Sequence, residues 1–198
     1  MKVAIVGGTG DFGLALARRL VEAGDEVVIG SRDAERAQEK ANEVGAAGGA
    51  ANEEAVTGAD IVVFATRADA ALPTATALAD AIGTTPVLSV ASDLRSTDAL
   101  SLAQRMQDLL RAPVVAGLHS LAAGKLAHGR PDEDAIVCGD DEDAKALALE
   151  LAAKVVAGRA LDAGPLASAR ALEGMTAVIV NLNKRYKGHA GIRVTGLP

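Results

Sequence analysis

A short glycine-rich stretch near the start of the chain has the spacing of a phosphate-binding turn. Residues 7–13 read GGTGDFG, in which Gly8, Gly10 and Gly13 fit the pattern G-x-G-x-x-G. Glycines so spaced permit a tight turn, close approach of the backbone to a pyrophosphate and close packing of a helix on a strand. The stretch follows the apolar run VAIV and opens an amphipathic segment, so it predicts dinucleotide binding at a helix N-terminus. The alternative is a glycine turn that only connects strand to helix. The cofactor-binding residues predicted here also include Thr9, Asp11 and Phe12.

The end of the second apolar run indicates which dinucleotide is bound. An NAD enzyme usually presents an acidic residue there to the ribose 2′-hydroxyl, whereas this chain reads VVIGSRDAER. Ser31 and Arg32 occupy that position, and Arg36 lies one helical turn further on, where guanidinium groups can bind a 2′-phosphate. Asp33 is expected to be a helix N-cap rather than a ribose ligand. These residues predict NADP, although Arg36 taken alone is equally compatible with a solvated helix surface.

The elements that position these residues alternate along the chain. Apolar runs VAIV, EVVIG, DIVVFA, PVLSV, PVVAG and DAIVCG are candidate strands, with Ala65 at the end of the third expected beside the cofactor. Helical patterns lie between them at residues 11–23, 33–44, 68–82, 97–110 and 142–156. This alternation predicts an α/β fold, a Rossmann-type doubly wound parallel sheet. Residues 45–52 are expected to form only a small-residue loop. One further short strand, RALDAG, and a long helix over 167–185 then form a small C-terminal helical extension.

Composition limits the classes of protein to consider. The 198 residues have 49% hydrophobic content and no segment dividing them, so we expect a single domain, 1–198, in which residues 163–198 complete the site. The single cysteine, Cys138, excludes an intrachain disulfide and is expected to be buried, and no metal site is predicted. No apolar run is long enough for a membrane span, which suggests a cytoplasmic protein. A formal net charge of −6 argues against nucleic-acid binding.

Six short blocks, in order along nearly the whole chain, resemble the NADPH-dependent reductases of coenzyme F420, the 8-hydroxy-5-deazaflavin. These blocks are KVAIVGGTGDFG, VVIGSRDAERA, VVAGLHSLAA, VCGDDEDAK, LDAGPLASARALEGMTAVIVNLN and KRYKGHAGIR. The resemblance implies hydride transfer between NADPH and the deazaflavin without a metal, in a compact Rossmann protein that forms homodimers. It implies NADP at Thr9, Ser31, Arg32 and Arg36, and the deazaflavin near His119, Gly174, Met175 and Thr176.

Hydride transfer requires little beyond two rings held face to face at roughly 3 to 3.5 Å with water excluded. His119 is the candidate to hydrogen-bond the deazaflavin ring or its carbonyl, with a structural histidine as the alternative. Thr176 is the second candidate catalytic residue, although a threonine within a helix can instead bond to its own turn.

Two departures from the family pattern bear on the identity of the acceptor. Arg67 and Ala68 stand where many members have Pro-Trp, and the loop over residues 89–97 is short. The alternatives are therefore an NADPH-dependent reductase of another acceptor, such as a flavin, an imine or a carbonyl compound, or a non-catalytic NADP-binding sensor.

The end of the chain differs in charge from the rest of it. Residues 181–198 contain Lys184, Arg185, Lys187 and Arg193 and no acidic residue. Positive charge there could steer an anionic coenzyme, since F420 carries a phosphodiester and glutamates, or it could dock on an acidic surface of the protein or of a second subunit.

Overall fold

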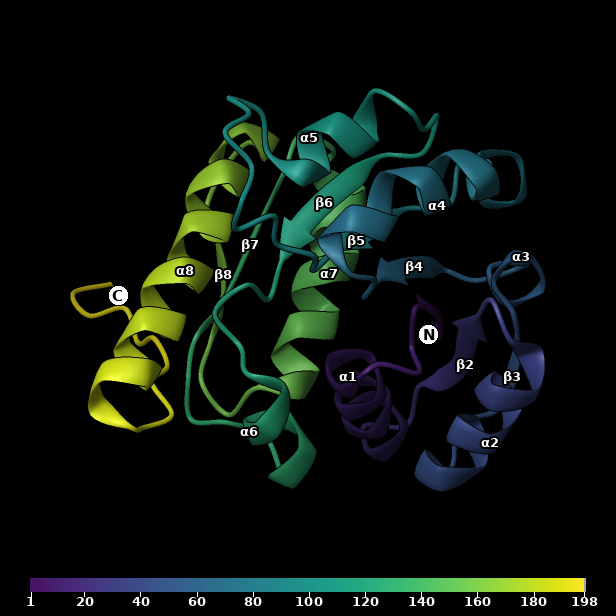
Figure 1. The fold of residues 1–198 in the computed structure, drawn as a ribbon, viewed down its shortest axis with the longest axis horizontal. Helices are drawn as coiled ribbons and strands as arrows, with labels where there is room; N and C mark the ends of the chain where they lie inside the picture. The colour runs from purple at the N-terminus through teal and green to yellow at the C-terminus, as the bar shows by residue number, and fades with distance from the viewer. Residues whose placement is uncertain (198) are drawn as a thin grey trace.

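The sheet follows from strands whose side chains are buried on both faces. The computed structural model describes residues 1–197, which form one eight-stranded sheet in the order β3-β2-β1-β4-β5-β6-β7-β8 (Figure 1). Pairing is parallel except that β7 runs antiparallel to β6, and β8 is parallel to β7. The order 3-2-1-4-5-6 is that of a dinucleotide-binding Rossmann sheet. The strands are β1 (Lys2–Val6), β2 (Glu26–Ser31), β3 (Gly48–Ala51), β4 (Ile61–Phe64), β5 (Val87–Ser89), β6 (Val114–Gly117), β7 (Ala135–Gly139) and β8 (Ala160–Asp162).

Successive side chains of β1 point to opposite faces of the sheet, and both faces are covered by helices. Val3 and Ile5 belong to one apolar core, built with α1, α2, α6 and α7, whereas Ala4 and Val6 belong to a second core with α4, α5 and α8. The predicted doubly wound fold with a C-terminal helix is thereby confirmed. The helices are α1 (Asp11–Glu22), α2 (Ala34–Val44), α3 (Asn52–Ala55), α4 (Ala68–Ile82), α5 (Leu102–Gln107), α6 (Ala123–His128), α7 (Glu142–Val155) and α8 (Ala169–Tyr186), the last preceded by a 3₁₀ turn, Leu166–Ser168.

Two sequence predictions were wrong, each for a local reason. The stretch over 45–52 is not merely a loop, because Gly48–Ala51 pairs in parallel with β2 as strand β3. A Cβ at Gly49 would overlap the backbone of Ala37, so glycine lets α2 pack directly on this strand. The helix expected over 97–110 begins only at Leu102, because Ser101 and Gln104 form a capping box.

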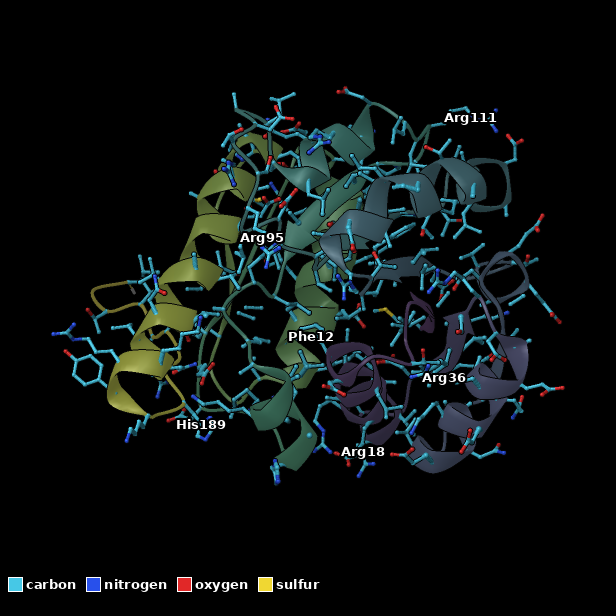
Figure 2. All side chains as sticks on the ribbon, viewed as in Figure 1. Phe12, Arg18, Arg36, Arg95, Arg111 and His189 are labelled. Atoms are coloured by element: carbon cyan, nitrogen blue, oxygen red, sulfur yellow. The ribbon has the colours of Figure 1, made fainter. Side chains whose placement is uncertain are left out.

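The basic C-terminal segment docks in part on an acidic segment of the same chain. Arg193 forms an ion pair with Asp132 at 2.9 Å, and Val194 N–H donates to the buried Asp134 carboxylate at 2.9 Å. Gly191 lies against the Glu133 side chain, which would have to move to admit a Cβ at this position. Docking on the chain's own acidic surface, one of the two roles considered, therefore holds for residues 191–194. Figure 2 shows His189 near the end of α8, in the stretch that leads to this contact.

Within residues 1–197, no helix combines the length and the apolar character needed to cross a membrane.

Candidate functional site: a cofactor cleft joined to a second cavity

The candidate site lies beyond the carboxyl ends of five neighbouring strands. The segments that follow β1, β2, β4, β5 and β6 line two adjoining hollows. The larger is a cleft of about 540 Å³ and the smaller a cavity of about 250 Å³, and the two share Ala65, Thr66 and Arg67 after β4. Ligands of open α/β sheets bind at this edge, next to the point where strand order reverses, here between β1 and β4.

The glycine turn after β1 leaves the start of α1 open. No side chain caps this 12-residue helix, in contrast to α2, where Asp33 accepts a hydrogen bond from the N–H of Arg36 at 3.1 Å. Asp33 is therefore the N-cap predicted from the sequence. Free N–H groups at a helix N-terminus, together with the helix dipole, suit a pyrophosphate.

Different physical constraints favour glycine at the different positions of this turn. A Cβ at Gly8 would lie 2.8 Å from the carbonyl oxygen of Ile5, and one at Gly13 would lie 2.8 Å from Gly8 Cα. Gly10 has only ordinary contact, 3.6 Å from the carbonyl of Gly7, and it borders the cleft. Gly7, which the pattern did not single out, has φ +75° and would meet Thr66. Gly7, Gly8 and Gly13 thus shape the turn, while Gly10 leaves room for a ligand.

The segment after β2 brings two arginines to the cleft. Ser31, Arg32 and Arg36 all line it with Thr9, as predicted, and both guanidinium groups are without an ion pair among residues 1–197. Figure 2 shows Arg36 on the α2 side of the turn and Phe12 on the other side, and Phe12 lines the smaller cavity. Unpaired arginines beside an open helix N-terminus fit a dinucleotide with an additional phosphate.

Two cleft residues were missed by the sequence analysis. Asn52, at the start of α3, and Thr66, after β4, each have a side-chain oxygen that is shielded from solvent and lacks a hydrogen-bond partner within residues 1–197. Such atoms are uncommon in folded proteins and mark positions where a ligand can supply the partner. Recognising β3 would have placed Asn52 at the same sheet edge as Ser31.

The smaller cavity is lined by seven apolar residues together with one histidine, one arginine and three residues that carry a hydroxyl group. Its lining comprises Phe12, Ala65, Thr66, Arg67, Ala68, Val90, Ala91, Ser92, Leu118, His119, Leu121 and Thr176. Arg67 stands at the junction with the cleft, where its side chain is 86% exposed and pairs with Asp69 at 3.0 Å. The cavity therefore offers apolar side chains against which a planar ring can pack, with polar groups beside them and a charged group at its entrance.

His119 is held neutral in the wall of this cavity. It is only 6% exposed, and burial lowers its pKa from 6.5 to about 4, although the carbonyl of Ala91 acts in the opposite direction. Because a carbonyl can only accept, Nε2–H donates to Ala91 O at 3.3 Å, which leaves Nδ1 unprotonated and without a partner within residues 1–197. The ring thus has no free proton to donate to a substrate carbonyl.

Thr176 joins three segments rather than its own helical turn. Its hydroxyl donates to the carbonyl of His119 at 2.8 Å and lies 3.0 Å from the hydroxyl of Ser92. With the His119–Ala91 hydrogen bond, these contacts link the ends of β5 and β6 to α8. The alternative considered for Thr176, a bond to its own helical turn, is absent, and the network fixes the shape of the cavity.

Leu118 adjusts the direction of the chain just before His119. Its φ of 63° is in the left-handed region, which costs a non-glycine residue about 1–2 kcal/mol. The N–H of Leu118 still bonds to Ile136 O at 3.2 Å, so β7 holds this turn in place. Backbone strain at the edge of a cavity is common at functional sites.

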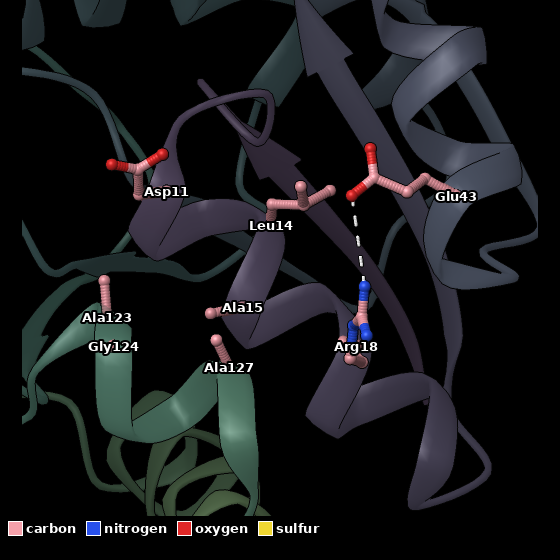
Figure 3. Close-up of a pocket in the computed structure, with 8 residues that line it drawn as sticks. All are labelled: Asp11, Leu14, Ala15, Arg18, Glu43, Ala123, Gly124 and Ala127. Carbon is pink, nitrogen blue, oxygen red and sulfur yellow. Dashed lines mark ion pairs between the residues drawn. The ribbon is translucent and has the colours of Figure 1, made fainter.

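Three other predicted site residues lie apart from these hollows. Gly174 is exposed on α8, and Met175 packs against the second core rather than lining the cavity. Asp11 borders a separate groove of about 360 Å³ between α1, α2 and α6, where Arg18 faces Glu43 at 4.0 Å (Figure 3). Of the predicted C-terminal residues, only Thr176 lines the cavity.

Other reactive groups do not add chemistry to the site. Cys138 is fully buried on β7, as predicted, and burial raises the pKa of its thiol to about 11. In the described part of the chain, no cluster of three or more His, Cys, Asp or Glu side chains is arranged to hold a metal ion.

Comparison with known proteins identifies the family. A family profile described as NADP oxidoreductase, coenzyme F420-dependent, matches residues 2–93. The F420-dependent NADP reductase of Methanothermobacter thermautotrophicus is 39% identical over 223 positions, covering 100% of this chain and 96% of the relative. This chain belongs to the F420-dependent NADP reductase family. The reductase of Methanocaldococcus jannaschii is 33% identical over 222 positions, covering 100% of this chain and 99% of the relative.

A crystal structure of another family candidate agrees with the whole fold. A protein of Arthrobacter sp. FB24, described as a candidate F420-dependent NADP reductase, superposes with a TM-score of 0.88 at 25% identity, covering 99% of this chain and 100% of that one. The family resemblance inferred from the six sequence blocks is confirmed. Since the alignments with the archaeal reductases exceed 198 positions, those relatives contain residues that this chain lacks.

Proposed function

We propose that this protein transfers a hydride between NADPH and coenzyme F420. The observation that carries the proposal is the junction at residues 65–67, where the arginine-lined cleft and the apolar cavity share a wall in a chain of this family. When bound, the coenzymes supply the redox chemistry, with hydride passing from nicotinamide C4 to deazaflavin C5 and a proton completing the reduced deazaflavin. The protein's task is to bind, orient and exclude water.

The cleft binds NADP(H) through charge and backbone N–H groups. The open N-terminus of α1, reached past Gly10, binds the pyrophosphate, and Ser31, Arg32 and Arg36 bind the 2′-phosphate. The unpaired state of both arginines supports this assignment, because a guanidinium already held by a carboxylate would bind phosphate less well. The NADP(H) specificity of the site thus comes from the segment after β2.

The cavity takes the acceptor ring, and His119 shapes it without acting as an acid. Its N–H is used by Ala91, and its neutral state removes a positive charge from an apolar wall. Thr176 fixes His119 and Ser92, so the role we propose for both catalytic candidates is to hold the ring in place and to shield the reacting atoms. The C-terminal part, residues 163–198, completes the site through Thr176; its last residue, 198, lies outside the described part of the chain. The whole chain then acts as a single domain.

A second candidate function follows from Arg67. This exposed guanidinium stands at the entrance of the cavity, where Arg67 and Ala68 replace the Pro-Trp of the family pattern. A charged entrance favours a different acceptor, such as a flavin, an imine or a carbonyl compound, with the same NADPH cleft.

Absorbance distinguishes these functions, because oxidised deazaflavin is coloured and fluorescent and its reduced form is not. The protein is mixed with NADPH and F420, and the Gly10→Val variant, which blocks the cleft, is the matched control. Loss of deazaflavin colour with the native protein alone supports the proposal. Faster oxidation of NADPH with a flavin or a cyclic imine supports the second candidate, whereas NADPH binding without turnover of any acceptor indicates a sensor.

We also propose a homodimer formed through α8. Val178, Leu182 and Tyr186 are 58%, 40% and 73% exposed and recur every four residues, so they form an apolar stripe on one side of this helix. The same stripe on a second copy is complementary to it around a two-fold axis. Light scattering tests this: Val178→Ser with Leu182→Ser halves the mass, whereas Leu109→Ser, at a residue 41% exposed elsewhere, does not. An unchanged mass in the double variant contradicts the α8 interface.

A further inference from the structure

Glu173 is a buried carboxyl group that the proposed chemistry does not use. It lies on α8, one turn before Thr176, and is 1% exposed. Burial raises its pKa, while the backbone N–H of Leu102 and the charge of Arg170 act in the opposite direction. Because withdrawing a carboxyl group from water is unfavourable, its retention here calls for a partner that an apolar side chain could not provide.

Glu173 contacts the end of one loop directly and its middle through Arg170. Oε1 accepts a hydrogen bond of 2.6 Å from the N–H of Leu102, where α5 begins and the loop over residues 93–102 ends. Oε2 lies 3.5 Å from Arg170, whose other guanidinium nitrogen donates to the carbonyl of Ser96 at 3.0 Å. Glu173 and Arg170 together hold the middle and the end of residues 93–102 against α8.

This loop continues directly into the wall of the cavity. Ala91 and Ser92 line it, and Ser92 contacts Thr176 at 3.0 Å. Figure 1 shows α5 beside the first turns of α8, which is where Glu173 joins them. The contacts of Glu173 and Thr176 therefore act on the same segment from one helix, and neither reaches the arginine-lined cleft.

We propose that Glu173 is a positioning residue for the hydride acceptor. It fixes residues 93–102, and through them Ala91 and Ser92, in the shape that receives the acceptor ring. The inference rests on the proposed function, which assigns this cavity to the acceptor. A purely structural role would instead lower stability without distinguishing acceptor from NADPH.

Three variants separate positioning from stability. Glu173→Ala removes the contacts with Leu102 and with Arg170, and Glu173→Gln keeps an oxygen that accepts from Leu102. Ile179→Ala, at a buried residue on α8, weakens packing without touching the loop. Glu173→Ala raises the acceptor KM about tenfold and leaves the NADPH KM within about twofold. Glu173→Gln restores the acceptor KM to within about threefold of the native value, and Ile179→Ala changes neither KM.

Hydrogen exchange supplies a measurement that does not depend on turnover. In Glu173→Ala, the amides of residues 92–101 exchange about tenfold faster than in the native protein, whereas Ile179→Ala leaves them unchanged. If Glu173→Ala does not fold, Arg170→Ala replaces it, with faster exchange expected around Ser96 and a raised acceptor KM.

Unchanged exchange in the loop, or an equal rise of both KM values, overturns the inference. If the native protein does not reduce F420 while the loop still exchanges faster in the variant, the proposed function fails and the positioning of this segment stands.

Discussion

The neutral state of His119 makes stability depend on pH in a predictable way. Its pKa is about 4 in the folded protein against 6.5 ordinarily, so the unfolded chain binds a proton first as the pH falls. The free energy of unfolding that the neutral His119 ring contributes is therefore fully present above pH 6.5 and is lost as the pH falls toward 4. The gap between the two values corresponds to about 3 kcal/mol, of which about 2 kcal/mol is lost between pH 8 and pH 5.

Urea unfolding at pH 8 and pH 5 measures this contribution. His119→Asn removes the titrating ring, so the free energy of unfolding of the variant should lack the loss of about 2 kcal/mol that His119 contributes in the native protein. Ser120→Ala is the matched control, since it alters the neighbouring buried side chain without removing a titrating group. If the native protein and His119→Asn lose the same free energy between these pH values, His119 is not a buried neutral ring and the reasoning is refuted.

The remaining predictions concern the cleft and the basic segment. Arg32→Ala should reduce the binding free energy of NADPH by about 1.5 to 3 kcal/mol in titration calorimetry and change that of NADH little, because only NADPH carries the 2′-phosphate. Equal losses of binding free energy for the two cofactors would count against the assignment. Gly10→Val should fold normally, since its Cβ has space, yet fail to bind NADPH, whereas Gly13→Ala should lower the melting temperature because its Cβ meets Gly8; normal NADPH binding by Gly10→Val would place the phosphate site elsewhere. Lys184→Glu with Lys187→Glu should raise the acceptor KM at low salt and leave NADPH affinity unchanged, since exposed charges act most strongly there; an unaltered acceptor KM would leave these lysines without a steering role.

Much of the fold could be predicted because local signals agreed with the tertiary structure. The helix expected over 68–82 has those bounds, and Asp33 caps α2 as its position before an amphipathic run suggested. β3 could not be recognised, since its two glycines have low strand propensity and Gly49 is required only because Ala37 of α2 packs against it. The start of α5 was predictable in principle from Ser101 and Gln104, a capping signal that outweighed the helical pattern before it.

The candidate site was predicted in part, and the omissions have one physical cause. The glycine turn and the arginines after β2 are local motifs that sequence alone could single out, and both segments border the cleft. Asn52, Thr66 and Ser92 become site residues only because separate strand ends meet at one sheet edge. The pKa of His119 likewise depends on burial by distant segments, and no pattern around residue 119 reveals that its N–H is already used.

Direct transfer of hydrogen between the two coenzymes tests the central claim most directly. NADPH carrying deuterium at C4, in each of its two stereochemical forms, is incubated with F420 and the protein, and the reduced deazaflavin is analysed by mass spectrometry and NMR. The account predicts deuterium at C5 of the deazaflavin from one of the two forms only, because a face-to-face arrangement of the rings selects one hydrogen. Reduced deazaflavin without deuterium from either form, or no reduction at all, would contradict it.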